Sequence, residues 1–166
     1  MTLIGPDKPA LVDALATLVA SHGGNWLESR MMHLSGQFAG ILRIELPSER
    51  EAIFRSKLPS LEEQGLKVVI HSAMPPSFPA VERKLVKLNL VGQDRPGIVQ
   101  QISRALAQNG ANVEELETEL SSAPMSGETL FKAQAIVSFR ADADLTGARA
   151  DLEKIAADLM VELNLE

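Results

Sequence analysis

The sequence predicts an α+β protein made of two similar modules, each with the element order β-α-β-β-α-β and a four-stranded antiparallel sheet. A stretch near the N-terminus recurs in the second half of the chain. In both halves, alternating apolar residues typical of half-buried strands are interleaved with apolar stripes at helical spacing. A Pro-rich stretch between the copies cannot continue a helix or an interior strand. We therefore expect modules over 1–73 and 84–166, joined by a linker over 74–83.

The repeat is the clearest of these observations. Residues 5–28 and 92–115 align without a gap at an offset of 87 positions, and eight of the 24 aligned pairs are identical. The repeated unit has the order of a strand end, an Asp-basic-Pro turn, a helix, a Gly turn and an Asn that leads into a second strand. The identical pairs are Gly5/Gly92, Asp7/Asp94, Pro9/Pro96, Val12/Val99, Ala20/Ala107, Gly23/Gly110, Asn25/Asn112 and Glu28/Glu115.

The first half follows the predicted element order along its whole length. Ser48 and Glu51 have the spacing of a capping box, so a second helix should begin there and run to about Gln64, where Gly65 stops it. The expected strands cover 2–4, 25–34, 38–46 and 66–71, and the first helix covers about 10–22.

The second half shows the same pattern more clearly. Val86, Leu88 and Leu90 alternate with polar residues, as expected for a half-buried strand. Asp94 is placed to cap the following helix and Pro96 to stand in its first turn. The expected strands cover 84–91, 112–120, 130–139 and 161–165, with a helix that ends at 109–110, a turn over 122–127 and a second helix over 145–159.

This element order is that of the ferredoxin-like fold, in which two helices cover one face of a four-stranded sheet. The other face, or an edge of the sheet, is left free to pair with a second module. Two such modules in one chain can pair with each other, which gives the duplication a physical reason.

Composition and charge narrow the function. The formal net charge is −6, from 16 basic and 22 acidic residues, and the basic residues form no stripe. Because DNA binding draws on Lys and Arg contacts to phosphates, we expect no direct contact with nucleic acid. The absence of cysteine excludes disulfides, thiolate catalysis and cysteine zinc sites. No apolar run could span a membrane and the N-terminus lacks signal-peptide features, so we expect a cytoplasmic protein.

The candidate ligand site is the turn before the first helix of the second half, together with Asn112. Backbone N–H groups at a helix N-terminus favour a carboxylate, and Gly97 allows close approach because it has no Cβ. Asn112 offers a donor and an acceptor beside that turn, for the ammonium of a free amino acid. The structural alternative is that Asp94 is only an N-cap, Pro96 only a first-turn residue and Asn112 only a turn residue.

These residues resemble the hallmark of the ACT domain, a small-molecule-binding regulatory module that usually senses amino acids. The hallmark is a strand running into an Asp-Arg-Pro-Gly turn, then a helix, then an Asn at the start of the second strand. In the first half Ala10 replaces the glycine, and its methyl group would crowd a ligand. This copy is expected to bind less readily, or only within a site shared between modules. The implied ligand-binding residues are Asp94, Arg95, Pro96, Gly97, Ile98 and Asn112 in the second half, and Asp7, Lys8, Pro9 and Asn25 in the first.

Catalysis finds little support in the sequence. His22, His33 and His71 have no carboxylate or second histidine at metal-ligand spacing, so neither a catalytic nor a metal site is expected. One acidic strand could provide paired carboxylates for acid–base chemistry, although a solvated face is the simpler interpretation. Its acidic residues are Glu114, Glu115, Glu117 and Glu119.

Two ACT-like modules without an attached catalytic or DNA-binding domain resemble the glycine cleavage system transcriptional repressors. The resemblance implies a small amino-acid effector, glycine first, and action through contact with a LysR-type transcriptional activator. A homodimer is expected, and no cofactor. Two alternatives stay open. One is a regulatory subunit that controls an amino-acid metabolic enzyme. The other is an acylphosphatase-like enzyme, whose Gly-rich phosphate loop with a following Phe-Arg is missing from this sequence.

Overall fold

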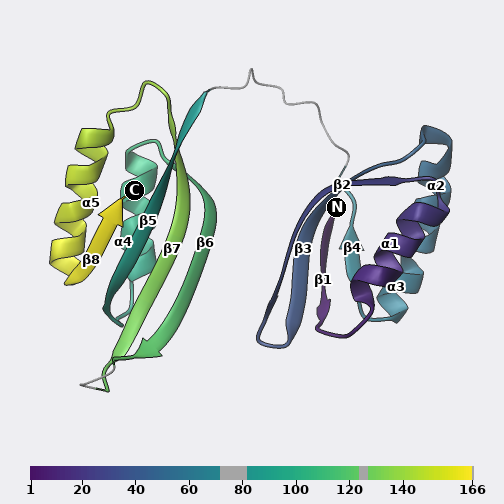
Figure 1. Ribbon diagram of the computed structural model, residues 1–166, viewed down its shortest axis with the longest axis horizontal. Coiled ribbons are helices and arrows are strands. Elements are labelled where there is room, and N and C mark those ends of the chain that lie inside the picture. Colours follow the sequence, from purple (N-terminus) through teal and green to yellow (C-terminus); the bar gives the residue numbers. More distant parts are fainter. Residues whose placement is uncertain (72–81, 124–126, 166) are drawn as a thin grey trace. The chain divides into compact units, whose positions relative to one another are not determined.

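The computed structural model describes residues 1–71, 82–123 and 127–165. The chain divides into two compact units, Met1–Pro75 and Pro76–Glu166. Each unit contains one four-stranded antiparallel sheet with its helices on one face (Figure 1). The predicted fold class, two ferredoxin-like βαββαβ modules, is therefore confirmed. The predicted linker over 74–83 lies outside the described residues except for Glu82 and Arg83, and Arg83 already belongs to a strand.

The elements of the first unit are β1 (Thr2–Pro6), α1 (Leu11–Ser21), β2 (Asn25–Leu34), β3 (Gln37–Glu45), α2 (Ser48–Lys57), α3 (Pro59–Glu63) and β4 (Lys67–Val69), with the strand order β2-β3-β1-β4. The predicted second helix is divided, because Pro59 has no N–H to donate and begins a separate helix. The predicted capping box is wrong. Pro47, not Ser48, occupies the N-cap position, and the Glu51 carboxylate accepts from the Arg55 side chain at 2.7 Å.

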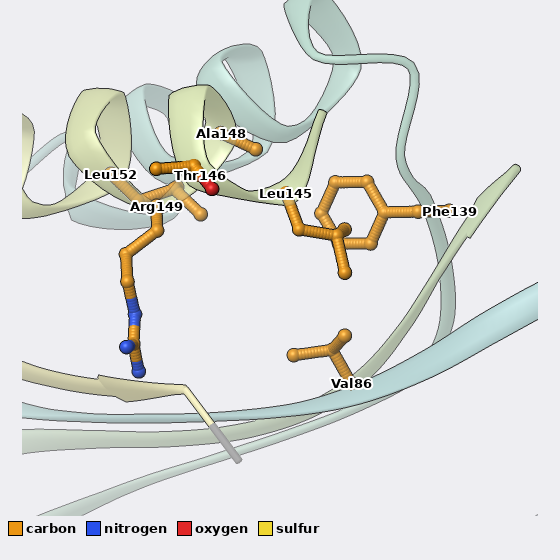
Figure 2. Close-up of a pocket in the computed structure, with 7 residues that line it drawn as sticks. All are labelled: Val86, Phe139, Leu145, Thr146, Ala148, Arg149 and Leu152. Atoms are coloured by element: carbon orange, nitrogen blue, oxygen red, sulfur yellow. The ribbon is translucent and has the colours of Figure 1, made fainter. Parts of the chain in front are cut away.

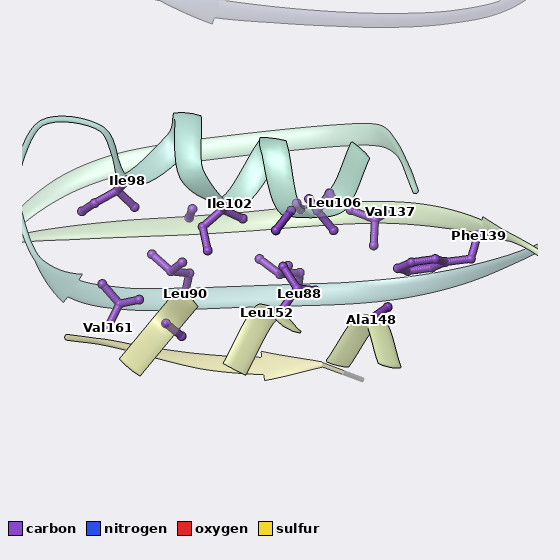
Figure 3. Packing of buried hydrophobic residues seen from close by; sticks show 14 residues of the cluster. Leu88, Leu90, Ile98, Ile102, Leu106, Val137, Phe139, Ala148, Leu152 and Val161 are labelled. Carbon is purple, nitrogen blue, oxygen red and sulfur yellow. The ribbon is translucent and has the colours of Figure 1, made fainter. Parts of the chain in front are cut away.

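The elements of the second unit are β5 (Arg83–Gln93), α4 (Ile98–Gln108), β6 (Asn112–Ser122), β7 (Thr129–Arg140), α5 (Leu145–Leu159) and β8 (Val161–Leu165), with the strand order β6-β7-β5-β8. The predicted alternation is confirmed, since Leu88 and Leu90 of β5 are buried against α4 and α5 with every second residue of β7 (Figure 3). Of the predicted turn over 122–127, residues 124–126 lie outside the described part of the chain.

The two sheets differ on the face that the helices of their own unit do not cover. In the first unit five apolar side chains of this outer face, from β1, β2, β3 and β4, are more than half exposed, and they are interspersed with Thr2, Arg30 and Lys67. In the second unit the rows on that face are mainly polar or charged, with Leu85 and Ile136 among them. The apolar residues are Ile4, Met32, Leu34, Ile41 and Val69, and the polar ones include Lys87, Glu115, Glu117, Lys132 and Gln134.

Candidate functional site

The turn between β5 and α4 carries most of the predicted ligand residues. The Asp94 amide donates to the Thr129 carbonyl oxygen at 3.0 Å, which fixes the turn to the end of the sheet. Gly97 occupies the N-cap position with a φ of 94°, in the left-handed region that glycine adopts without strain. The prediction that Asp94 caps the helix and Pro96 stands in its first turn is wrong, because both precede this cap residue and α4 begins at Ile98.

The N-terminus of α4 has no side-chain cap among the described residues. The first N–H groups of any helix lack an intrahelical acceptor, because no preceding turn supplies one. The helix therefore presents its first amides, beginning with that of Ile98, to an anion. The positive end of the helix dipole lies at the same place. The Ile98 side chain is only 3% exposed and belongs to the core, so Ile98 can contribute no more than its backbone to a ligand site.

Arg95 contacts α5, the other helix of the unit. Its Nη2 atom donates to the Asp158 carbonyl oxygen at 2.9 Å, in the last turn of α5. A cation at this position interacts favourably with the unpaired carbonyls and the negative end of the helix dipole. Arg95 Nε is buried without a hydrogen-bond partner in the described part of the chain. Arg95 thus ties the turn to α5, whereas Asp94 and Pro96 are exposed.

Asn112 does not lie beside the turn of its own unit. It opposes Ser138 on β7, whereas Gln93, the last residue of β5, opposes Leu130 on the same strand. Eight positions of β7 separate these two rows, which is roughly 26 Å at the rise of a β-strand. The expected proximity of Asn112 to the turn is therefore wrong. Helix α4 runs back along the sheet, so β6 begins at the same end of the sheet as β5. Asn25 opens β2 at the far end of the first sheet for the same reason.

Asn112 instead belongs to a polar cluster that the spacing of residues along the sequence does not reveal. Its Nδ2 atom donates to Glu114 Oε1 at 2.9 Å, and the Ser138 hydroxyl donates to the same oxygen at 2.5 Å. Arg83 Nη1 donates to Ser138 Oγ at 3.0 Å. The cluster joins the beginning of β5, the beginning of β6 and the end of β7, so only the strand register brings these residues together.

The first unit repeats the turn with an alanine at the cap. Ala10 has a φ of 70° and directly precedes α1, and the Asp7 amide donates to the Gly36 carbonyl oxygen at 2.9 Å. Asp7, Lys8 and Pro9 are exposed. The two turns therefore share one backbone path, including the left-handed residue before the helix.

Of two hollows, one in each unit, only that of the first unit lies beside a predicted turn. One of about 480 Å³ lies beside the end of β1 and is lined in part by Gly5, Gln37 and Gly65. Another, of about 350 Å³, opens between α5 and its sheet, with a largely apolar lining and the Arg149 side chain reaching across it (Figure 2). Asn112 does not line this second hollow.

The described residues contain neither a membrane-spanning helix nor a cluster of metal-ligating side chains. Among the described residues, no helix is both long and apolar enough to cross a bilayer. Nor does the described part of the chain bring together three or more His, Cys, Asp or Glu side chains that could hold a metal ion.

Comparison with known families decides the assignment. The sequence pattern of the ACT domain matches residues 1–71 and again residues 84–165, so the two matches coincide with the two units. The chain belongs to the ACT-domain family. It is a tandem ACT protein, as the repeated turn and the repeated Asn predict.

Two solved structures are similar over both modules, and one curated relative is similar over about half of the chain. A crystal structure of an unknown protein from Galdieria sulphuraria has a TM-score of 0.83 and 28% identity, covering 99% of this chain and 94% of the other. A "putative glycine cleavage system transcriptional repressor" has a TM-score of 0.71 at 18% identity, covering 99% and 93%, and shows the shared fold. The UPF0237 protein of Methanococcus maripaludis is 29% identical over 82 residues, 49% of this chain and 84% of that protein.

Proposed function

We propose that this tandem ACT protein is an amino-acid-sensing regulator rather than an enzyme, and that its effector is a small amino acid, glycine first. The observation that carries the proposal is the β5–α4 turn. There the left-handed Gly97 leads into a helix whose first amides have no side-chain cap among the described residues. Such a helix end attracts a carboxylate through its N–H groups and its dipole.

The ammonium group of the amino acid requires a second contact. Within one unit Asn112 lies at the other end of the sheet from the turn, far beyond the span of a small amino acid. A site that uses both must therefore take the turn from one copy of the chain and the Asn from a second copy. The effector would then favour the state of the protein that binds it and shift the population towards that state.

The regulatory target follows from the resemblance to the glycine cleavage system repressors. We propose a cytoplasmic homodimer that contacts a LysR-type transcriptional activator and does not touch DNA. The net charge of −6 supports action through a protein partner, because phosphate contacts need clustered basic residues. The apolar side chains that are more than half exposed on the outer face of the first sheet, Ile4, Met32, Leu34, Ile41 and Val69, support association with a second copy, because exposed apolar surface rimmed by polar residues is typical of interaction sites.

A second candidate is a regulatory subunit for an amino-acid metabolic enzyme, which the ACT assignment supports equally well. Affinity purification with the tagged full chain from its own cells distinguishes the two. Recovery of a LysR-type activator supports the first candidate, and stoichiometric recovery of a metabolic enzyme supports the second.

A thermal-shift screen of the twenty amino acids tests the sensing function directly, because a ligand that binds only the native state raises its stability. We expect glycine or another small amino acid to raise the melting temperature at millimolar concentration. Gly97→Val should abolish the increase, since a β-branched residue is strained at this φ and its side chain obstructs the turn. Ala10→Val, which imposes similar strain on the first turn, is the matched control. No increase with any amino acid would contradict the proposal.

A further inference from the structure

The polar cluster at the start of β6 has a buried anchor. Ser138 is fully buried, and its hydroxyl both donates to Glu114 Oε1 and accepts from Arg83 Nη1. A buried hydroxyl is stable when it both donates and accepts, whereas loss of the acceptor leaves its buried O–H without a partner, at a cost of about 1–3 kcal/mol. Ser138, which accepts from Arg83, therefore holds one carboxylate oxygen of Glu114 in a defined place.

A β-bulge makes room for this carboxylate. Val113 pairs with Val137 and Glu115 with Ile136, so Glu114 is the extra residue of β6 at the bulge. Bulges re-aim side chains at the ends of sheets. Here the bulge lets the Glu114 side chain reach Asn112, two residues before it, and Ser138 on the neighbouring strand at the same time.

The contact between Glu114 and Asn112 has only one chemically sensible orientation. An ionised carboxylate accepts hydrogen bonds and donates none, so only the NH₂ group of the Asn112 amide can face it. The carbonyl oxygen of Asn112 is on the other side of the same planar group. One N–H of Asn112 is taken by Glu114, and its Oδ1 is left as an acceptor of fixed orientation for a ligand at this end of the sheet.

We propose that Glu114 is a positioning residue that locks the Asn112 amide, so that its Oδ1 accepts a hydrogen bond from the ammonium of a bound amino acid. The inference rests on the proposed function and deepens it. An acceptor selects ligands that carry N–H donors, so the site favours an amino acid over a carboxylic acid with no hydrogen-bond donor on the neighbouring carbon.

The first module lacks this device. It has the same bulge, between Trp26 and Glu28, but the extra residue is Leu27. The residue opposite Asn25 is Glu45, where the second module has the buried Ser138. Within the described part of the chain no hydrogen bond joins the Asn25 amide to Glu45 or to any other carboxylate, and no buried hydroxyl anchors Glu45. The lock belongs to the second module, and Asn25 serves as an internal comparison.

The first experiment observes the lock in the free protein. In NMR spectra of the full chain, the Asn112 side-chain amide should show one strongly shifted, slowly exchanging proton. Glu114→Ala should remove this signature, while Glu114→Gln, which keeps an acceptor oxygen, should restore part of it. Glu117→Ala, which removes an exposed carboxylate from the same strand, should leave it unchanged. An unchanged Asn112 signal in Glu114→Ala would overturn the inference without bearing on amino-acid binding.

The second experiment measures selectivity by calorimetry, with glycine and acetate as probes, because acetate has the same carboxylate but no hydrogen-bond donor on the neighbouring carbon. We expect the unaltered chain to bind glycine at least tenfold more tightly than acetate. Glu114→Ala should weaken glycine binding about tenfold, with acetate little affected, and Glu114→Gln should recover part of the loss. Equal glycine affinity in the chain and in Glu114→Ala would overturn the positioning role. Failure of the unaltered chain to bind glycine would overturn the glycine proposal, while the amide signal would still decide whether Glu114 holds Asn112.

Discussion

The β1–α1 and β5–α4 turns have the same backbone but different chemistry. In both, the Asp amide donates to a carbonyl oxygen at the neighbouring hairpin, and the residue before the helix is left-handed, with φ of 70° at Ala10 and 94° at Gly97. Only the second module has glycine there. An alanine in this conformation costs about 1–2 kcal/mol relative to its right-handed form.

This difference separates what the fold requires from what a ligand requires. The left-handed residue persists in the first module at the cost of strain, so the path from strand to helix needs it whether or not a ligand binds. The missing Cβ and the Glu114 lock on Asn112 occur only in the second module. We infer that the first module preserves the scaffold, and that the second holds the residues best arranged for recognition.

The largest expected effect falls on the glycine before each turn, which the fold requires in both modules. A Cβ at Gly5 would fall on the Gly65 carbonyl oxygen, and one at Gly92 would fall on the Val161 side chain and lie 2.8 Å from its Cα. Gly5→Ala and Gly92→Ala should each reduce the free energy of unfolding by about 1–3 kcal/mol or more. Chemical denaturation measures this.

Gly110→Ala is the matched control for both variants. Unlike Gly5 and Gly92, Gly110 has a positive φ, of 69°, and no atom of the described residues lies within 4 Å of the position of its Cβ. It should lose only about 1 kcal/mol, from backbone strain. If Gly92→Ala were no more costly than Gly110→Ala, the close approach of β8 to the turn would not be a requirement of the fold.

Close contacts between residues far apart in the chain, such as those of Gly5 and Gly92, could not be predicted from the sequence. Strands β5 and β7 could be predicted, because the alternation of apolar and polar residues places Leu88 and Leu90 in one core. The repeated Asp-basic-Pro turn predicted the family. The start of α4 could not, because a left-handed Gly97 rather than a side-chain cap begins it. The cluster around Ser138 depends on strand register and a bulge, which no linear spacing encodes.

The second prediction compares the two asparagines. Asn112→Ala should weaken amino-acid binding at least tenfold, because a hydrogen bond to a charged group contributes about 1.5–3 kcal/mol. Asn25→Ala should weaken amino-acid binding less, because no carboxylate of the described residues orients the Asn25 amide as Glu114 orients that of Asn112. Calorimetry with glycine on both variants measures the difference. A larger loss in Asn25→Ala would reverse the division of roles between the modules.

The third prediction exchanges the cap residues. Gly97→Ala should lower the free energy of unfolding by about 1 kcal/mol, since the side chain is accommodated but the left-handed backbone is strained. Ala10→Gly should raise it, by somewhat less, because glycine relieves the strain but adds entropy to the unfolded chain. The double variant should be close to the unaltered protein in denaturant titrations. Destabilisation by Ala10→Gly would show that the alanine methyl group packs favourably in the first turn.

The smallest effect on stability is expected on the outer face of the first sheet, which exposes more apolar side chains than that of the second. Ile41 is 64% exposed, so Ile41→Lys should change the free energy of unfolding of the isolated chain by no more than about 0.5 kcal/mol. The same change should reduce the dimer fraction in light-scattering measurements, because a homodimer that buries this face would have to desolvate a further ammonium group. Gln134→Lys, in the polar row with Asn89 and Glu117 on the outer face of the second sheet, is the control and should leave association intact. If Ile41→Lys leaves the dimer unchanged, or if the chain is a monomer, the apolar face does not hold two copies together.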